Sequence, residues 1–229
     1  MCIRDRFYVT RDVLDLPDAV HTEVPVVMPP KAHKIYSSLE DDFYAKVGNG
    51  EVTASNALVK LLRLQQITSG YLATDDGTTE HIHTAKEDAL EAILDGLHTE
   101  EPVVVFCRFK GDLEAVHRVC SKLKRGSAEL SGSRKELETW QQGGAPVLAA
   151  QIRTAREGID MVRACYCIYF SLGFALSDYE QSLARTHRPG QERTVHYFHL
   201  VVEGTVDRKV YDALQARKDV ITSILDGGR

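Results

Sequence analysis

The most informative stretch of this chain is Gln181-Ser-Leu-Ala-Arg185-Thr-His187-Arg188-Pro-Gly190-Gln191. If residues 178–187 form a helix, positions 181, 185 and 188 share one face, because residues three and four apart are helix neighbours. The Pro-Gly pair then predicts the end of that helix. Arginine is permanently charged and carries a planar fork of donors, so two arginines at a helix end are suited to binding phosphate. A solvated basic turn is the alternative, but the number of specified identities makes chance a poor explanation.

Around this stretch, short apolar runs alternate with amphipathic stretches from Pro102 onward, which predicts an α/β architecture. The predicted strands are residues 103–106, 128–130, 146–150, 165–170 and 195–201. The predicted helices are residues 111–123, 134–141, 178–187 and 205–225. Strand and helix in alternation give right-handed crossovers, with helices on both faces of a parallel sheet.

The first 101 residues have a different pattern. Prolines at positions 17, 25, 29 and 30 predict an extended linker with an edge strand. Two helices are predicted at residues 32–46 and 54–68, separated by the Gly48-Asn-Gly50 break. A loop is expected at residues 71–84, followed by a helix at 84–97 with an apolar stripe.

Composition narrows the possible functions. The formal net charge of -5 argues against a broadly basic nucleic-acid surface, so any contact with DNA must be local. No apolar run approaches the roughly 20 residues that span a membrane. Five cysteines form no C-x-x-C pair, and Cys165 and Cys167 fall in a strand pattern that predicts core packing. We therefore expect a reducing cytoplasm, no structural disulfide and no metal site, since only His81-Ile-His83 has a suitable spacing and solvated loop histidines are commoner.

A second stretch, Val147-Leu-Ala-Ala-Gln151-Ile-Arg153-Thr-Ala-Arg156-Glu-Gly158-Ile159-Asp160, predicts a strand that leads into a small polar loop. Together with the first stretch, it resembles the Swi/Snf-type superfamily 2 helicase-like ATPases, specifically the fifth and last motifs of their second RecA-like lobe. The resemblance runs in the expected order from about Phe7 to Leu225. It implies an α/β, RecA-like doubly wound parallel sheet with an N-terminal helical and linker extension. Residues 1–84 would be the inter-lobe linker and helical extension, and residues 85–229 the helicase C-terminal lobe.

The resemblance implies roles for the last motif. In the family, both motif arginines face ATP held between two lobes, and the distal one acts as an arginine finger. Arg185 and Arg188 are thus the expected catalytic residues. Gln181 would help to organise the cleft, and Gly158 and Asp160 would contribute to the nucleotide side from the fifth motif.

Nucleic-acid contacts follow from the same resemblance. The expected DNA-binding residues come from the fourth and fifth motifs and the loop between them: Arg108, Gly132, Ser133, Arg153, Thr154 and Arg156. The family usually has a Gly-Gly pair where this chain has Ala155-Arg156. Glycines allow close approach of backbone to phosphate, so their loss either alters the loop or replaces amide contacts with the Arg156 side chain. An ordinary turn without a ligand remains the alternative for each of these loops.

Two further positions match the family less specifically. Phe174 lies where the family usually carries tryptophan, and we expect it to pack rather than react. Lys86 lies where the family often has a lysine that opens the lobe. A solvated helix start would explain Lys86 equally well.

The sequence lacks half of an ATPase site. It contains no G-x-x-x-x-G-K-[ST] phosphate loop and no Asp-Glu pair after an apolar strand. ATP and Mg²⁺ would therefore be bound mainly by a first RecA-like lobe, in a longer chain or in a separate polypeptide. Residues 1–6 fit no part of the pattern, which favours an interrupted reading frame.

The predicted function is accordingly the C-terminal lobe of an ATP-dependent double-stranded DNA translocase. The alternative is a non-catalytic DNA- or protein-binding module derived from a degenerate lobe. An unrelated doubly wound small-molecule enzyme would need a Gly-rich first βα turn, and the sequence has none.

Overall fold

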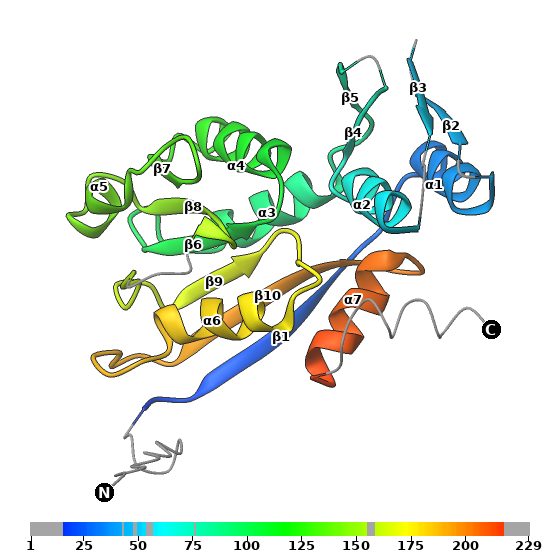
Figure 1. The fold of residues 1–229 in the computed structure, drawn as a ribbon. Helices are drawn as coiled ribbons and strands as arrows, with labels where there is room; N and C mark the ends of the chain where they lie inside the picture. Colours follow the sequence, from blue (N-terminus) through cyan, green and yellow to red (C-terminus); the bar gives the residue numbers. More distant parts are fainter. Residues whose placement is uncertain are drawn as a thin grey trace, which may run out of the picture.

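A six-stranded parallel sheet forms the centre of the molecule (Figure 1). The computed structural model describes residues 16–42, 44–47, 50–53, 57–75, 77–154 and 159–217. The strand order is β1-β10-β9-β6-β8-β7, and every neighbouring pair is parallel. The strands are β1 (Ala19–Val26), β6 (Val103–Cys107), β7 (Ser127–Leu130), β8 (Val147–Gln151), β9 (Tyr166–Tyr169) and β10 (Val195–Val202). The predicted doubly wound α/β fold is confirmed.

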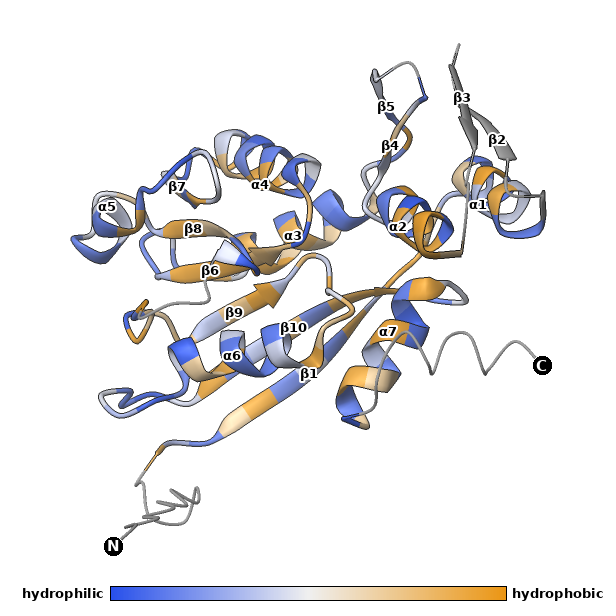
Figure 2. Ribbon diagram, in the orientation of Figure 1, coloured by the Kyte–Doolittle hydropathy of each residue, from blue (hydrophilic) through white to orange (hydrophobic). Residues whose placement is uncertain are grey.

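The central strands are buried on both faces, which explains their continuous apolar runs (Figure 2). All five residues of β6 are fully buried. The helices that cover the sheet are α3 (Ala85–Asp95), α4 (Lys110–Lys122), α5 (Leu137–Gln141), α6 (Leu176–Thr186) and α7 (Val206–Gln215). The step from β6 through α4 to β7 runs in the opposite direction to the step from β9 through α6 to β10. Right-handed crossovers therefore place α4 and α6 on opposite faces.

The helical extension contains α1 (Pro30–Asp42), α2 (Ala57–Thr68) and two hairpins. The hairpins pair β2 (Tyr44–Val47) with β3 (Gly50–Thr53), and β4 (Tyr71–Ala73) with β5 (Thr79–His81). The predicted helix over 32–46 is therefore wrong beyond Asp42, and the predicted loop over 71–84 is in part a hairpin. Tyr and Val have high strand propensity, and the sequence between the paired strands contains Gly48-Asn49 in the first hairpin and Asp76-Gly77 in the second, so both hairpins had a local signal.

The edge strand expected in the N-terminal linker is present as β1, which pairs with β10 from Ala19↔Val195 to Val26↔Val202. The division into an extension of residues 1–84 and a lobe of residues 85–229 stays a prediction. β1 lies within residues 1–84 but pairs with β10 in the sheet of the lobe. The helix predicted over 134–141 begins only at Leu137. The chain before it returns to β7, since the Glu136 amide donates to the Glu129 carbonyl at 2.8 Å. α7 ends at Gln215, and residues 218–225 of its predicted length lie outside the described residues.

Candidate functional site

The two motif arginines lie at and beyond the C-terminal end of α6. Gln181 and Arg185 are one turn apart on the helix, where Gln181 is exposed and Arg185 is half-buried. The helix ends at Thr186, because His187 has left helical geometry with ψ at 82°. The prediction that all three residues share one helical face is therefore wrong for Arg188, which follows the helix in a separate half-buried turn.

Other polar residues of the same motif bind backbone groups and fix the path of the chain. The Gln191 side-chain amide is buried and donates to the carbonyls of Val162 and Ala164, both at 3.0 Å. The imidazole Nε2 of His187 donates to the Pro17 carbonyl at 2.7 Å. Sequence reasoning concentrated on the arginines and missed this structural role of the motif.

Gly190 is needed where it stands. Its φ is +102°, a backbone conformation that L side chains rarely adopt. The turn also contains a 3.0 Å hydrogen bond from the Gln191 amide to the Arg188 carbonyl. The Gly-Gln pair therefore closes the turn that carries Arg188.

The end of the fifth motif lies directly against this turn. The Met161 amide donates to the Arg185 carbonyl at 3.1 Å. Asp160 precedes Met161, and its carboxylate accepts a 2.9 Å hydrogen bond from the Val162 amide. Asp160 is exposed, and its carbonyl accepts from the Gln141 side chain at 2.8 Å. The structure thus brings Asp160 close to Arg185, while Gly158 and Arg156 lie outside the described residues.

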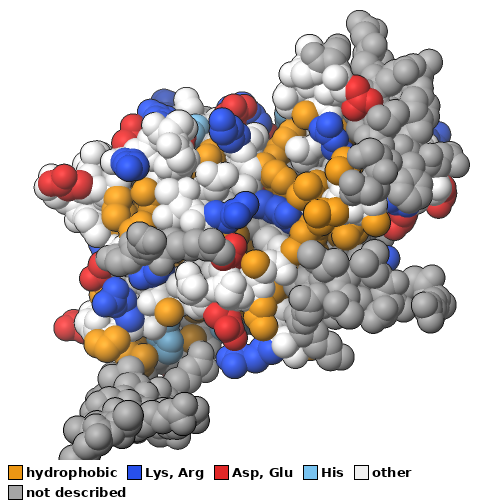
Figure 3. All heavy atoms as spheres, in the orientation of Figure 1, with side chains coloured by type: hydrophobic (Ala, Val, Ile, Leu, Met, Phe, Trp, Pro, Cys, Tyr) orange, Lys and Arg blue, Asp and Glu red, His pale blue; other side chains and the backbone are white. Residues whose placement is uncertain are grey.

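A second polar surface lies at the carboxyl edge of the sheet, where parallel strands deliver their loops to one side. Arg108 follows β6, Arg153 follows β8 and Phe174 follows β9. All three line a cavity of about 200 Å³, so the structure brings these two predicted DNA contacts together. On the face drawn in Figure 3, basic side chains lie beside an apolar area, which fits a local rather than a broad basic surface.

Arg108 is held in this cavity. Its guanidinium carbon lies 4.0 Å from the centre of the Phe174 ring, a cation–π arrangement. Burial lowers the pKa of Arg108 to about 10, an effect that nearby Asp112 opposes and Arg153 reinforces. Arg108 therefore remains charged at neutral pH. Phe174 packs, as predicted from the sequence.

The Ser131–Ser133 loop lies farther along the same edge, after β7. Gly132 and Ser133 are exposed, as a contact with phosphate requires. The Ser131 hydroxyl donates to Glu129 at 2.5 Å and accepts from the backbone amides of Ser133 and Arg134, both at 3.1 Å. These amides are thus engaged within the loop. Gly132 and Ser133 do not line the cavity of Arg108. Thr154, the residue after Arg153, is half-buried.

The interpretation of Lys86 as a solvated helix start is wrong. Its side chain is 1% exposed and forms an ion pair with Asp207 at 2.6 Å. The Thr68 hydroxyl donates to the other carboxylate oxygen of Asp207 at 2.9 Å. Lys86 is the second residue of α3 and Asp207 the second residue of α7. The available signal was therefore two charges near helix starts, but a burial pattern does not show that they pair with each other.

Sequence reasoning also missed Asp112, which is fully buried. Its carboxylate accepts from the Ser171 hydroxyl at 2.5 Å and from the backbone amides of Phe109 and Arg108 at 3.0 and 3.2 Å. Burial raises the pKa of Asp112, although these hydrogen bonds favour the ionised form. The available signal was an aspartate three residues into a helix, the usual position of a capping carboxylate.

The two histidines with a metal-like spacing have structural roles. His83 is buried and its Nε2 lies 2.8 Å from the Ile67 carbonyl, so the solvated-loop interpretation is wrong for it. Burial lowers the pKa of His83. His81 lies 3.2 Å from Glu87. In the described ranges, no three His, Cys, Asp or Glu side chains form a group that could hold a metal ion.

The cysteines of the described residues are free and buried. Cys165 and Cys167 lie in the core, as their strand pattern predicts. None of the helices in the described part of the chain is long and apolar enough to cross a membrane.

Residues 85–190 match the family model of the helicase conserved C-terminal domain. The match covers somewhat less than half of the chain. Among relatives, protein p41 of Acyrthosiphon pisum secondary endosymbiont phage 1 is 27% identical over 94% of this chain and 47% of its own length. An uncharacterized ATP-dependent helicase of Mycoplasma pneumoniae is 22% identical over 92% of this chain and 21% of its own length. The chain thus spans about half of the first relative and a fifth of the second.

Solved structures share the fold of this chain. The C-terminal part of the Fun30 ATPase domain superposes with a TM-score of 0.62 at 16% identity, covering 86% of this chain and 89% of that structure. The Sulfolobus solfataricus SWI2/SNF2 ATPase core in complex with dsDNA gives a TM-score of 0.60 at 22% identity, covering 91% of this chain and 47% of that one. The predicted RecA-like fold and the resemblance to the Swi/Snf-type second lobe are confirmed.

Proposed function

We propose that this chain is the second lobe of a DNA-stimulated ATPase that translocates along double-stranded DNA. In this proposal Arg185 and Arg188 face ATP that a first RecA-like lobe holds, and Arg188 acts as the arginine finger. The observation that carries the proposal is the turn after α6. Gln191 and His187 bind backbone carbonyls there, so the chain is fixed on both sides of Arg188. An arginine finger needs such a fixed position.

The residues present fit one side of a nucleotide site. Arg185 and Arg188 are three residues apart in the chain, and two guanidiniums facing ATP would suit the phosphate oxygens that gain charge during phosphoryl transfer. Gln181, one turn before Arg185 on α6, and Asp160, next to the Met161 amide that bonds the Arg185 carbonyl, would complete this side of the nucleotide site. Gly158 would contribute as well. The phosphate loop and the carboxylates that hold Mg²⁺ belong to the first lobe. Bound there, Mg²⁺ would neutralise developing phosphate charge.

Contact with DNA is assigned to the carboxyl edge of the sheet. Arg108 and Arg153 share one cavity, and Gly132, Ser133 and Thr154 follow neighbouring strands. Arginine side chains at such an edge neutralise backbone phosphates without reading sequence. The similarity to the Sulfolobus solfataricus ATPase core, which was solved in complex with dsDNA, supports this choice of partner. The free, buried cysteines of the described residues fit a reducing cytoplasm as the place of action.

The test is ATP turnover by the chain alone and by the chain mixed with a matching first lobe, each with and without double-stranded DNA. We expect turnover only in the mixture, with stimulation by DNA. Robust turnover by the chain alone would refute the division of the site between two lobes.

A non-catalytic binding module is the second candidate, and Ala155-Arg156 in place of Gly-Gly favours it. A mixture that binds DNA but never turns over ATP would support this candidate. Replacing both residues with Gly separates the two. Turnover gained by this replacement would identify a degenerate lobe, whereas a wild-type mixture that is already active would show that the loop is competent as it stands.

A further inference from the structure

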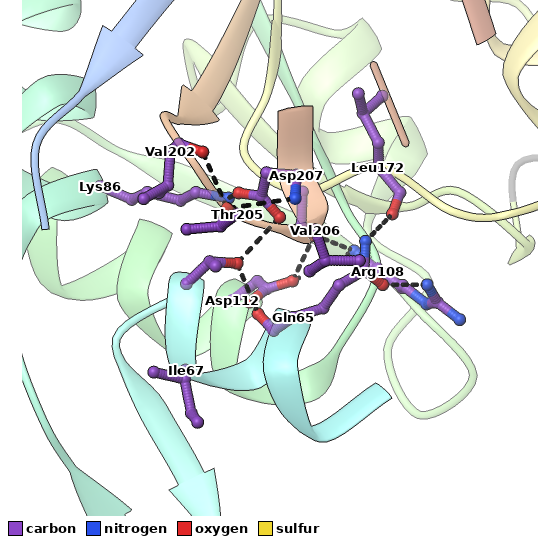
Figure 4. Close-up of polar contacts among 12 residues, drawn as sticks. Gln65, Ile67, Lys86, Arg108, Asp112, Leu172, Val202, Thr205, Val206 and Asp207 are labelled. Atoms are coloured by element: carbon purple, nitrogen blue, oxygen red, sulfur yellow. Dashed lines mark hydrogen bonds and ion pairs between the residues drawn. The ribbon is translucent and has the colours of Figure 1, made fainter. Parts of the chain in front are cut away.

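A buried glutamine connects the helical extension to the proposed DNA surface. Gln65 lies on α2, is 1% exposed, and belongs to no motif considered above. Figure 4 shows its side chain at the carboxyl edge of the sheet, next to Arg108 and near Leu172. A glutamine at such depth needs hydrogen-bond partners for both ends of its amide.

Gln65 has these partners: one is Arg108 itself, and the other lies in the loop that carries Phe174. Its Oε1 accepts a hydrogen bond from the Arg108 guanidinium. Its Nε2 donates to the Leu172 carbonyl at 3.0 Å. Leu172 precedes Phe174 by two residues, and Phe174 is the ring on which Arg108 lies. One amide therefore holds the arginine on one side and the loop that carries the ring on the other.

The glutamine is itself fixed by a buried polar network. The Thr68 hydroxyl, one turn farther along α2, lies 2.9 Å from both the Gln65 carbonyl and the Asp207 carboxylate. Asp207 pairs with Lys86 at 2.6 Å, and Thr68 is fully buried. The end of α2 is thus attached to the starts of α3 and α7, which gives Gln65 a rigid base.

We propose that Gln65 is a positioning residue that orders the Arg108 guanidinium over Phe174 for contact with the DNA backbone. The inference rests on the proposed function in assigning DNA to this edge. An arginine that is ordered before binding loses less side-chain entropy when it meets phosphate. Because Gln65 belongs to α2, a displacement of the helical extension would change the Arg108 geometry and so the grip on DNA.

The test uses the full chain, with Gln65→Met as the variant that keeps the volume and removes both hydrogen bonds. Gln66→Met is the matched control, since Gln66 is half-buried and accepts from Arg63 instead. The first readout needs no DNA: the Arg108 Nε–H signal in ¹⁵N NMR spectra, assigned by its loss in Arg108→Lys. We expect Gln65→Met to move this signal to the position of a solvated arginine, and Gln66→Met to leave it in place. An unchanged signal in Gln65→Met would overturn the proposal.

The second readout is the affinity for double-stranded DNA as a function of salt. We expect Gln65→Met to weaken binding by about fivefold to tenfold, and loss of the Arg108 contact to lower the salt slope by up to about 0.9. A changed NMR signal with unchanged DNA affinity would overturn the part of the proposal that concerns DNA. Failure of the wild-type chain to bind DNA at all would instead refute the proposed function, and the NMR readout would still decide the positioning.

A second variant, Gln65→Glu, keeps the proposal testable if Gln65→Met does not fold. Gln65→Glu keeps an acceptor for Arg108 but removes the donor to Leu172, so the Arg108 signal should remain ordered while the carboxylate neutralises the guanidinium. DNA affinity should then fall although the arginine stays in place. A solvated Arg108 signal in a folded Gln65→Glu chain would contradict the role of the Oε1 contact.

Discussion

The end of α6 and the carboxyl edge of the sheet are both built around arginine, but they are stabilised differently. At the end of α6, side chains of one short motif bind backbone carbonyls nearby, as Gln191 does with Val162 and Ala164. At the carboxyl edge, side chains from distant segments bind one another, as Gln65 does with Arg108. The first arrangement fixes a chain path, and the second fixes a side chain. The difference explains why only the first is visible in a short sequence motif.

The largest expected effect concerns the α6 end. Arg188→Ala in a mixture with a matching first lobe should reduce kcat for ATP by about 10³ to 10⁵, the range typical of arginine fingers. Arg185→Ala should also reduce turnover. The matched control is Arg193→Ala, an exposed arginine paired with Glu101 at 2.7 Å, which should leave kcat unchanged. Turnover by Arg188→Ala at the wild-type rate would contradict a catalytic role for the end of α6.

The next largest effect concerns the network of the carboxyl edge. Lys86→Met leaves the Asp207 carboxylate buried without its partner, which should lower the free energy of unfolding by about 3–5 kcal/mol. Chemical denaturation followed by circular dichroism measures this loss. Asp207→Leu combined with Lys86→Met should recover most of the stability, because an apolar pair leaves no unpaired charge. Lys122→Met, at an exposed pair with Glu91, should leave the unfolding midpoint in place.

Acid should weaken the support of α6. His199 on β10 is fully buried, and its Nε2 lies 3.0 Å from the Tyr179 hydroxyl of α6. Burial lowers its pKa to about 3 from a usual value of 6.5. The unfolded chain therefore binds this proton first, so the contribution of His199 is present above pH 6.5 and is lost as the pH falls toward 3. The expected slope is up to about 1.4 kcal/mol per pH unit, and His199→Phe should remove it.

This dependence is measured as the difference between wild-type and His199→Phe unfolding curves from about pH 7 to about pH 4, the range in which the two states bind protons differently. The difference isolates His199, because the other titrating groups are common to both chains. A wild-type curve that parallels the variant over this range would show that His199 does not link α6 to pH.

The smallest expected effect concerns the DNA surface. Arg153→Ala should weaken binding to double-stranded DNA by about tenfold and lower the salt slope by about 0.9, as for one lost phosphate contact. ATP turnover at saturating DNA should change little. Arg193→Ala again serves as the control. An unchanged salt slope for Arg153→Ala would show that Arg153 does not contact the DNA backbone.

Local signals decided what the sequence could predict. The apolar runs of β6 and β8, the alternation with helices and the arginine motif all lie within a few residues of what they determine. The parallel sheet followed from these local signals. The first hairpin of the extension was missed because the helix predicted over residues 32–46 ran into β2. The second was missed because residues 71–84 were expected to form a loop. The position of Arg188 was wrong because the helix ends at Thr186, one residue before the predicted end, so Arg188 leaves the helical face of Gln181 and Arg185.

Long-range pairing explains the rest. Gln65 and Arg108 are 43 residues apart, and Thr68 and Asp207 are 139 residues apart. No periodicity or motif spacing connects such positions, so a buried charge such as Lys86 looks like an ordinary surface lysine in the sequence. These contacts become visible only when the strand order places their loops at the same edge.

The most direct test of the central claim, that the two arginine surfaces have separate tasks, is the affinity of the Arg188→Ala mixture for double-stranded DNA. The measurement is made on the same preparation whose ATP turnover is known. We predict a Kd equal to that of the wild-type mixture together with lost turnover. Weakened DNA binding with surviving turnover would contradict the claim.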